Sequence, residues 1–589
     1  MKTLNSQSNQ AEYTDPVAEI SKKCRPGVVA VGIASALVNI LYLTASFFML
    51  QVYDRVIPSR SVASLVALGI LALLLYAFHA AFEVARNRIL VRISGVFDEI
   101  MARAVFSTTV RSALKLRQAG DGLQLLRDFD QLRTFLSGSG PTIIFDLPWI
   151  PFYVGICFLF HPLIGAMTIV GGAILALLTL AANRSTQKSA RRIHELSNER
   201  TSDIQAAQRN AEIVTALGMA DTLADRWISR NDAYRDAYRK NSDVANTYAT
   251  VSKIFRMVLQ SAVLAAGAVL VIENQASGGI IIASSILTSR ALAPVEQAIA
   301  NARAYAATLQ AWRRMNEILK AFPKEPFPML LPAPRRSLSV ENLVSGAPGQ
   351  TQALIAGVDF RVNAGSAIGI VGPSASGKSS LARTLTGVWP IFRGSIRLDG
   401  AALNQWDDIE LGTHIGYLPQ DIELFSGTVA ENISRFRRDA SAPAIIAAAT
   451  AAGVHDLILK LPRGYETEIG AGGNMLSAGQ RQRIGLARAL YGDPFLVVLD
   501  EPNSNLDADG ESAVTSAILG VRARGGIALV IAHRPSALAG VDHVMMVKDG
   551  QMQIFGRKED VLNSILQRQG RQVTLERSTP LKVVDGSEG

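Results

Sequence analysis

The feature that most constrains this 589-residue chain is a series of long apolar runs confined to its first half. The first run, residues 28–50, and the second, residues 62–82, are almost free of charge. About 20 such residues are needed to cross the hydrocarbon core of a bilayer. A buried helix of a large soluble protein is the alternative for any single short run, but the length of these two predicts membrane-spanning helices.

Four further runs bring the expected number of spans to six. They cover residues 143–160, 163–182, 255–272 and 278–291. The connections after the first, third and fifth spans are short, whereas residues 86–140 and 183–253 form long connections rich in Arg and Lys. Positive charge near span ends marks the cytoplasmic side. We therefore expect both termini to be cytoplasmic and the spanning helices to extend well beyond the lipid bilayer.

A few polar residues fall inside these apolar runs, where burial in lipid is costly. Asp146 is the clearest candidate for a transport path, and Asn39, Glu273 and Arg290 are weaker ones. Contact with lipid headgroups at a span end is the alternative interpretation for each of them. The pattern leaves both readings open.

The second half of the sequence predicts a soluble α/β domain. A proline-dense stretch separates it from the spans, because a segment with this many prolines cannot sustain a helix. We expect an N-terminal segment 1–26, a transmembrane domain 27–322, a linker 323–337, a nucleotide-binding domain 338–568 and a tail 569–589. The net charge of +9 concentrates beside the apolar runs, which favours a membrane surface over nucleic acid as the partner. Two cysteines cannot build a disulfide framework.

A phosphate-binding loop begins this soluble half. It follows an apolar strand pattern at 367–371 and precedes a helical pattern, which is the setting that the G-x-x-x-x-G-K-[ST] motif requires. Glycines let backbone N–H groups surround an anion, and the next helix presents the positive end of its dipole. We expect Lys378 to reach the outer phosphates of ATP and Ser379 to hold Mg²⁺. The nucleotide-binding residues are Gly372, Pro373, Ser374, Ala375, Ser376, Gly377, Lys378, Ser379 and Ser380.

Two acids end a second apolar strand pattern at 495–499. Asp500 is placed to help hold Mg²⁺, and Glu501 is the expected general base for the attacking water. A further anion-binding helix start is predicted at Ser477, Ala478, Gly479 and Gln480. One chain cannot easily present this start and the phosphate loop to the same nucleotide, whereas two chains arranged head to tail can. The sequence therefore predicts a homodimer with two shared ATP sites.

Together these residues resemble the ATP-binding cassette (ABC) family across the whole soluble half. The resemblance makes residues 476–480 the family signature, with Ala478 in place of the commoner glycine. It implies that Gln420 links Mg²⁺ and the water to the membrane half, that Asp507 belongs to a loop at the dimer interface, and that His533 contacts the γ-phosphate. The expected fold is an all-α six-helix transmembrane domain, similar to type IV ABC exporters, fused to an α/β nucleotide-binding domain.

Two departures from the family pattern stand out. Members usually carry an aromatic residue before the phosphate loop to stack on adenine, and residues 344–349 contain none. Exporters often carry an acid before the signature, where this chain has Ala471 or Gly472. The sequence therefore does not show which side chain stacks on adenine. It also leaves open the contact between cassette and membrane half that this acid makes in other exporters.

The membrane half resembles the permease-ATPases of bacterial type I protein secretion. The resemblance rests on residues 48–56, 145–151, 210–219 and 290–294. The short segment before the first span resembles the branch that exports proteases, lipases and other repeat-in-toxin proteins. It implies an inner-membrane ATPase that exports an unfolded protein with a C-terminal signal, through a periplasmic adaptor and an outer-membrane tunnel protein. Export of a lipid, peptide or small molecule, or an ATP-dependent switch without transport, are the alternatives.

Overall fold

A computed structural model describes residues 16–115, 123–138, 140–322, 331–532 and 534–564. The described residues form two compact units, one up to residue 322 and one from residue 331, with the end of the long helix α4 grouped with the second. The first unit is helical, and the second combines strands and helices.

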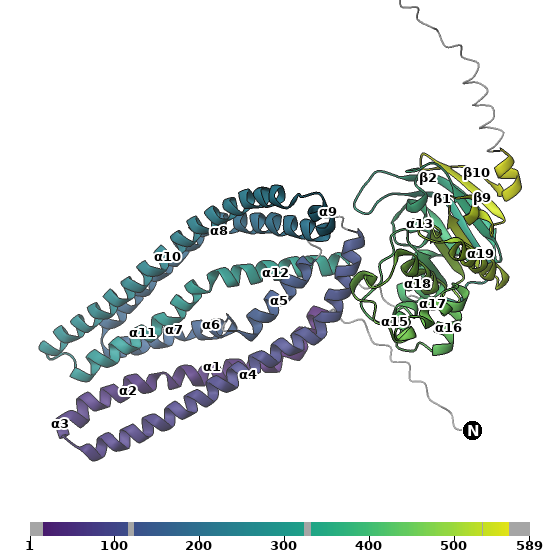
Figure 1. Ribbon diagram of the computed structural model, residues 1–589. Coiled ribbons are helices and arrows are strands. Elements are labelled where there is room, and N and C mark those ends of the chain that lie inside the picture. Colours follow the sequence, from purple (N-terminus) through teal and green to yellow (C-terminus); the bar gives the residue numbers. More distant parts are fainter. Residues whose placement is uncertain (1–15, 116–122, 139, 323–330, 533, 565–589) are drawn as a thin grey trace, which may run out of the picture. The chain divides into compact units, whose positions relative to one another are not determined.

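The first unit consists of long helices, several of which lie side by side (Figure 1). Its helices are α1 (Pro16–Leu41), α2 (Leu43–Gln51), α3 (Ile57–Ser59), α4 (Val62–Lys115), α5 (Gln124–Ser137), α6 (Gly140–Asp146), α7 (Ile150–Phe160), α8 (Pro162–Arg209), α9 (Ala211–Ala216), α10 (Ala220–Ile272), α11 (Gly278–Ala300) and α12 (Ala302–Ala321). A π-helical turn, Val52–Val56, joins α2 to α3. Pro148 lies in the turn between α6 and α7, where a proline ends the regular helical hydrogen bonding.

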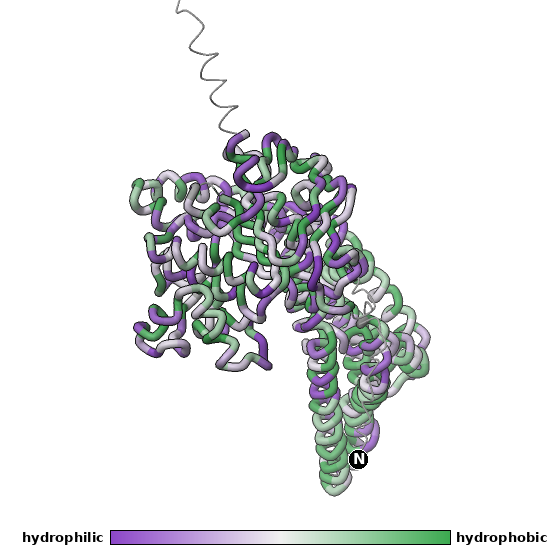
Figure 2. Tube along the Cα trace, turned by 90° about the vertical axis from the view of Figure 1, so that its right-hand side faces the viewer, coloured by the Kyte–Doolittle hydropathy of each residue, from purple (hydrophilic) through white to green (hydrophobic). Residues whose placement is uncertain are grey.

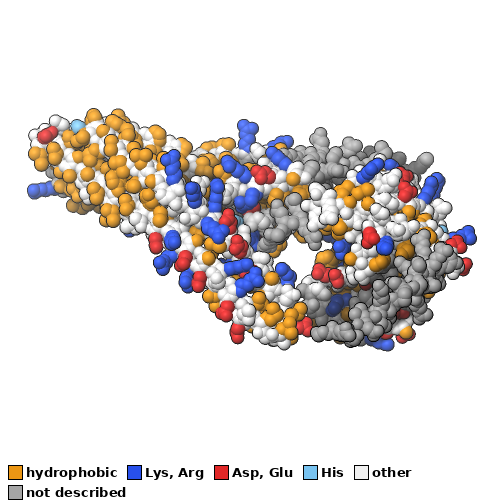
Figure 3. Space-filling view, turned by 90° about the horizontal axis from the view of Figure 1, so that it is seen from above, with side chains coloured by type: hydrophobic (Ala, Val, Ile, Leu, Met, Phe, Trp, Pro, Cys, Tyr) orange, Lys and Arg blue, Asp and Glu red, His pale blue; other side chains and the backbone are white. Residues whose placement is uncertain are grey.

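Six helical segments of the described chain are long and apolar enough to cross a membrane, so the prediction of six spans is confirmed. Hydrophobic residues dominate long stretches of these helices in Figure 2. In Figure 3 hydrophobic side chains cover one end of the helical unit, and charged side chains gather further along it. The longest helix, α4, has 54 residues and is therefore about 80 Å long, which exceeds the thickness of a bilayer.

Close helix packing builds a core among the spans. α8 and α10 run side by side, and a Cβ at Gly171 would come within 2.1 Å of a Leu259 methyl carbon. The absence of a side chain at this position therefore allows the two helices to approach. Ile164, Leu175 and Leu287 are among the fully buried members of this core. Small residues commonly have this role between membrane helices.

A second core lies in the charged extension of the helical unit. Phe97 and Met101 of α4 pack with Phe129 of α5 and Met315 of α12. The Asp128 carboxylate, which is 1% exposed, accepts hydrogen bonds from Arg314 at 2.6 and 2.9 Å. This ion pair, in which only the carboxylate is buried, links α5 to α12.

The second unit contains two sheets. A six-stranded sheet has the order β10-β9-β3-β8-β7-β6, and a four-stranded antiparallel sheet has the order β2-β1-β4-β5. The strands are β1 (Ser337–Ser345), β2 (Ile355–Asn363), β3 (Ala367–Val371), β4 (Ile391–Leu398), β5 (Ala401–Ala402), β6 (Ile415–Leu418), β7 (Leu496–Asp500), β8 (Ile527–Ile531), β9 (His543–Lys548) and β10 (Gln551–Arg557).

Four helices pack against the larger sheet: α13 (Lys378–Leu385), α14 (Asp408–His414), α18 (Ala478–Leu490) and α19 (Ala508–Ala523). Three short helices, α15 (Val429–Ile433), α16 (Ala442–Ala451) and α17 (His455–Leu459), form a group that packs on α18. β6, β7, β8, β3 and β9 are parallel, and every residue of β7 and β8 is buried, as expected for strands covered on both faces. This arrangement brings the carboxyl ends of these five strands to one edge.

Candidate ATP site and the polar cluster among the spans

The phosphate-binding loop connects β3 to α13. Gly377 has a φ of 96°, and a Cβ at Gly372 would come within 2.0 Å of the Val547 carbonyl oxygen. Both positions therefore require glycine, one for its backbone conformation and one for the close approach of another strand. The loop ends at the N-terminus of α13, where unpaired N–H groups and the helix dipole favour an anion.

Lys378 lies against this loop and is buried. Its Nζ donates hydrogen bonds to the carbonyl oxygens of Gly372 at 2.9 Å and Pro373 at 2.7 Å. Burial lowers the pKa of Lys378, and the nearby carboxylates of Glu501 and Asp500 oppose this shift. The ammonium group is thus held at the loop with two acids close by.

Ser379 and Asp500 face each other across the same site. Ser379 Oγ donates to Asp500 Oδ1 at 3.1 Å, while Asp500 Oδ2 is buried and has no hydrogen-bond partner in the described part of the chain. Burial raises the pKa of Asp500, and the Ser379 hydrogen bond opposes the rise. A hydroxyl and a buried carboxylate oxygen without a donor are a donor set that suits a hard divalent cation such as Mg²⁺.

Glu501 follows directly after β7. Its φ is 51°, the left-handed region that a non-glycine residue rarely adopts, and its N–H donates to the Ile531 carbonyl oxygen at 3.2 Å. Backbone strain of this kind costs free energy, and it is found preferentially at functional sites. The strained turn places Glu501 at the edge of the sheet beside Asp500.

The register of the parallel strands also brings Gln420 to this edge. Leu418 of β6 pairs with Leu499 of β7, so the exposed Gln420 leaves the sheet next to the two acids. Asp500 pairs with Ile531, the last residue of β8. The predicted His533 follows that strand two residues later, but it lies outside the described residues.

The predicted signature segment forms a capped helix start. Ser477 Oγ accepts a hydrogen bond from the N–H of Gln480 at 3.2 Å, and Gln480 Oε1 accepts from the N–H of Ser477 at 2.8 Å. This reciprocal pair is a capping box, which fixes the first turn of α18. Ala478 and Gly479 lie in that turn, and a Cβ at Gly479 would come within 3.0 Å of the Asn505 carbonyl oxygen.

Sequence reasoning missed Gln482, which links this helix to the sheet edge that carries Asp500 and Glu501. Its side chain is 2% exposed, and its Nε2 donates to the carbonyl oxygens of Glu501 at 3.2 Å and Pro502 at 2.5 Å. Its Oε1 accepts from the N–H of Asn505 at 3.1 Å. In the sequence, the only signal was its position two residues beyond Gln480. Its partners lie about twenty residues away, so only the fold shows the connection.

Asp507 caps the next helix, α19. Its Oδ1 accepts from the N–H of Gly510 at 2.9 Å and from Arg483 Nη2 at 2.7 Å. The hydrogen bond from Gly510 is the main reason that the pKa of Asp507 is lowered. The carboxylate therefore joins α18 to the start of α19 within one chain.

The aromatic ring of Phe392 lies against residues 344–349, the segment that contains no aromatic residue of its own. A Cβ at Gly346 would come within 2.7 Å of a ring carbon of Phe392, which belongs to β4 and is 42% exposed. β4 pairs with β1, with Ser345 opposite Ile391. The sequence segment 344–349 has no aromatic residue, but strand pairing brings one to it from outside.

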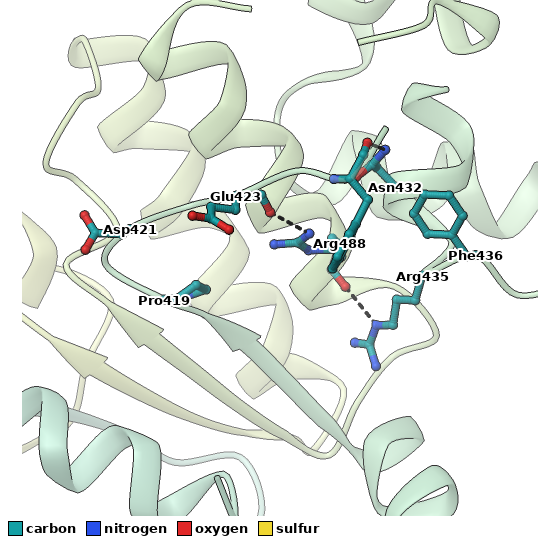
Figure 4. Close-up of a pocket in the computed structure, with 8 residues that line it drawn as sticks. Pro419, Asp421, Glu423, Asn432, Arg435, Phe436 and Arg488 are labelled. Carbon is teal, nitrogen blue, oxygen red and sulfur yellow. Dashed lines mark hydrogen bonds between the residues drawn. The ribbon is translucent and has the colours of Figure 1, made fainter. Parts of the chain in front are cut away.

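Beyond Gln420 the chain borders a pocket of about 330 Å³ (Figure 4). Arg435 donates to the carbonyl oxygens of Arg488 at 3.0 Å and Ala489 at 3.2 Å, and burial is the main cause that lowers its pKa to about 10. Arg488 in turn donates to the Glu423 carbonyl oxygen at 3.1 Å. These bonds anchor the segment after Gln420 to the end of α18.

Among the spans, Asp146 is part of a buried polar cluster. It accepts hydrogen bonds from Asn39 Nδ2 at 2.8 Å and from Arg86 Nη1 at 3.2 Å. Tyr153 donates to Asn39 Oδ1 at 2.9 Å. The cluster connects α1, α4, α6 and α7.

The other two polar residues predicted in the spans lie outside this cluster. Arg290 stacks on the Tyr42 ring at 4.3 Å, and Glu273 lies exposed after α10.

Comparison with known proteins identifies this architecture. The family model for the ABC transporter matches residues 355–504, and the model for the ABC transporter transmembrane region matches residues 28–294. The type I secretion system ATP-binding protein PrsD of Rhizobium meliloti is 59% identical over 582 residues, which cover 99% of both chains. The chain belongs to the ABC transporter family. As a member it couples ATP hydrolysis to transport, with its ABC membrane region and cassette on one chain.

More distant ABC transporters agree with this result. The cyclolysin secretion/processing ATP-binding protein CyaB of Bordetella pertussis is 27% identical over 538 residues, covering 89% of this chain and 74% of CyaB. The solved structure of a bacterial Atm1-family ABC exporter with ATP bound superposes with a TM-score of 0.80 at 23% identity, covering 95% of this chain and 99% of that one. This likeness shows that the six-span exporter fold is shared.

Proposed function

We propose that this ABC transporter is the inner-membrane ATPase of a type I secretion system and exports an unfolded protein with a C-terminal signal. The observation that carries the proposal is the full-length match to PrsD, because it includes the membrane half as well as the cassette. Similarity in a cassette alone would fit many transported substrates. We assign the cargo to the repeat-in-toxin class of proteases and lipases, and the partners to a periplasmic adaptor and an outer-membrane tunnel protein, with both termini in the cytoplasm.

The ATP site supports the hydrolysis that this function needs. Lys378 and the phosphate loop would bind the phosphates, and Ser379, Asp500 and Gln420 would hold Mg²⁺, which would supply charge neutralisation on the phosphates. Glu501 positions and polarises the attacking water. Residues 477–480 of a second copy complete each site, so the active form is a homodimer.

The cargo class is tested by reconstituting the protein in vesicles and measuring ATP hydrolysis. A peptide with the C-terminal sequence of a secreted repeat-in-toxin protein should stimulate hydrolysis, and the same residues in scrambled order should not. Stimulation by phospholipid or small molecules together with no response to the signal peptide would support the lipid-exporter alternative. Hydrolysis that never produces movement of cargo into the vesicle would support the switch alternative.

Replacement of Gln482 by alanine is expected to lower kcat for ATP hydrolysis by about tenfold while KM for ATP stays within about twofold. Gln482 holds the backbone of Glu501 and Pro502 but does not belong to the phosphate loop. A small displacement of a catalytic group costs rate more than binding. Steady-state kinetics separates the two parameters. Gln553→Ala, on the exposed face of β10, is the matched control. An equal change in KM would show that Gln482 has a merely structural role.

A further inference from the structure

A basic pocket opens on the surface of α4 near the start of the third span. It has a volume of about 420 Å³ and is lined by Val84, Asn87, Arg88, Val91, Arg92 and Ser137. Arg88 and Arg92 are four residues apart on one helix, so they lie on the same face one turn from each other. The lining contains two cationic side chains and no carboxylate.

Contacts with the first and third spans indicate where along the membrane normal this pocket lies. Gly27 directly precedes the first apolar run, and a Cβ at Gly27 would lie 3.0 Å from Cγ1 of Ile93. Ile93 follows Arg92 in α4. Ser137 lies three residues before Gly140, where the third span begins. The pocket is therefore level with the ends of the first and third spans, which is where lipid headgroups lie.

The two arginines differ from nearby arginines, which form ion pairs with carboxylates. Within the part of the chain that the structure describes, no hydrogen bond or ion pair joins Arg88 or Arg92 to another residue. Arg86 pairs with Asp146, and Arg133 pairs with Asp98 at 3.4 Å. A guanidinium at this depth favours an anionic partner, because the surroundings solvate it less well than water does.

We propose that Arg88 and Arg92 bind the phosphate of an anionic phospholipid at the membrane boundary. Asn87 and Ser137 would supply further hydrogen bonds to the headgroup. Val84 and Val91, which are 50% and 55% exposed, would contact the first part of an acyl chain. An acidic stretch of cargo fits less well, because it would leave these two apolar side chains uncovered. Basic pockets beside membrane helices bind anionic headgroups in this way.

The proposal is tested with the full-length protein in mixed micelles, by native mass spectrometry of retained lipid. Wild type should retain phosphatidylglycerol in preference to phosphatidylcholine. The double variant Arg88→Gln/Arg92→Gln should lower that preference by about 25-fold, because each basic residue near an anionic surface contributes a factor of about five. The control Arg226→Gln/Arg239→Gln removes the same charge from exposed sites of α10 far from the apolar part of that helix.

Three results would overturn the proposal. The first is an unchanged phosphatidylglycerol preference in Arg88→Gln/Arg92→Gln. The second is full displacement of the lipid by millimolar inorganic phosphate or by an aspartate-rich peptide, which would assign the pocket to a soluble anion or to cargo. The third is loss of the dimer in the double variant, which would show that a second copy covers the pocket. Because none of these readouts depends on the secretion signal, they are independent of the proposed cargo.

Discussion

Glu501→Gln is expected to lower kcat for ATP hydrolysis by about 1,000-fold while ATP still binds. Glutamine has the shape of glutamate, so the strained turn with a φ of 51° and its hydrogen bond to Ile531 should persist. An amide cannot accept a proton from the attacking water, and general base catalysis contributes about 10²- to 10⁴-fold. Lys378 and the loop around it are unchanged, so the affinity for the nucleotide should remain.

The measurement combines single-turnover hydrolysis with ATP binding at equilibrium. ATP that binds without being hydrolysed should hold two copies together, so the variant should also accumulate as a dimer when ATP is present. Glu559→Gln, an exposed acid of the same unit, controls for loss of charge. Hydrolysis at more than a tenth of the wild-type rate would show that another group is the base.

Arg86→Ala is expected to destabilise the membrane unit by about 3–5 kcal/mol, because it leaves a buried carboxylate without its cation. Arg86 is 5% exposed, and its Nη1 lies 3.2 Å from Asp146 Oδ1. Of the residues in this cluster, only Asn39 would then still donate a hydrogen bond to Asp146. The loss should appear as a lower unfolding temperature of the purified protein in lipid-containing micelles.

The double variant Arg86→Ala/Asp146→Ala provides the decisive comparison. It removes both charges together, so it should lose less stability than either single variant. Arg226→Ala, at an exposed site of α10, should leave the unfolding temperature unchanged. Equal losses in the single and double variants would show that the two side chains act through packing and not as an ion pair.

Much of the ATP site could be predicted because it is local in sequence. The phosphate loop occupies consecutive residues between a strand and a helix, and the acids Asp500 and Glu501 directly end another strand. Parallel pairing then brings strand ends together without further information. The capped start of α18 is equally local, since Ser477 and Gln480 are three residues apart.

The features that escaped prediction join distant parts of the chain. Gln482 contacts a backbone about twenty residues away, and Phe392 reaches Gly346 only through the pairing of β4 with β1. From the sequence alone, Asp146 fits either a transport path or a span end that contacts lipid headgroups. The structure gives it a partner, Arg86, sixty residues earlier.

The sequence by itself determined six membrane spans and the chemistry of a nucleotide-binding loop, because hydropathy and short-range motifs act over neighbouring residues. Only the tertiary structure decided which charges are neutralised. Arg86 and Arg88 are two residues apart, yet a step of two residues turns an α-helix by more than half a revolution. One side chain therefore meets Asp146 inside the bundle, while the other opens into a pocket at the membrane boundary.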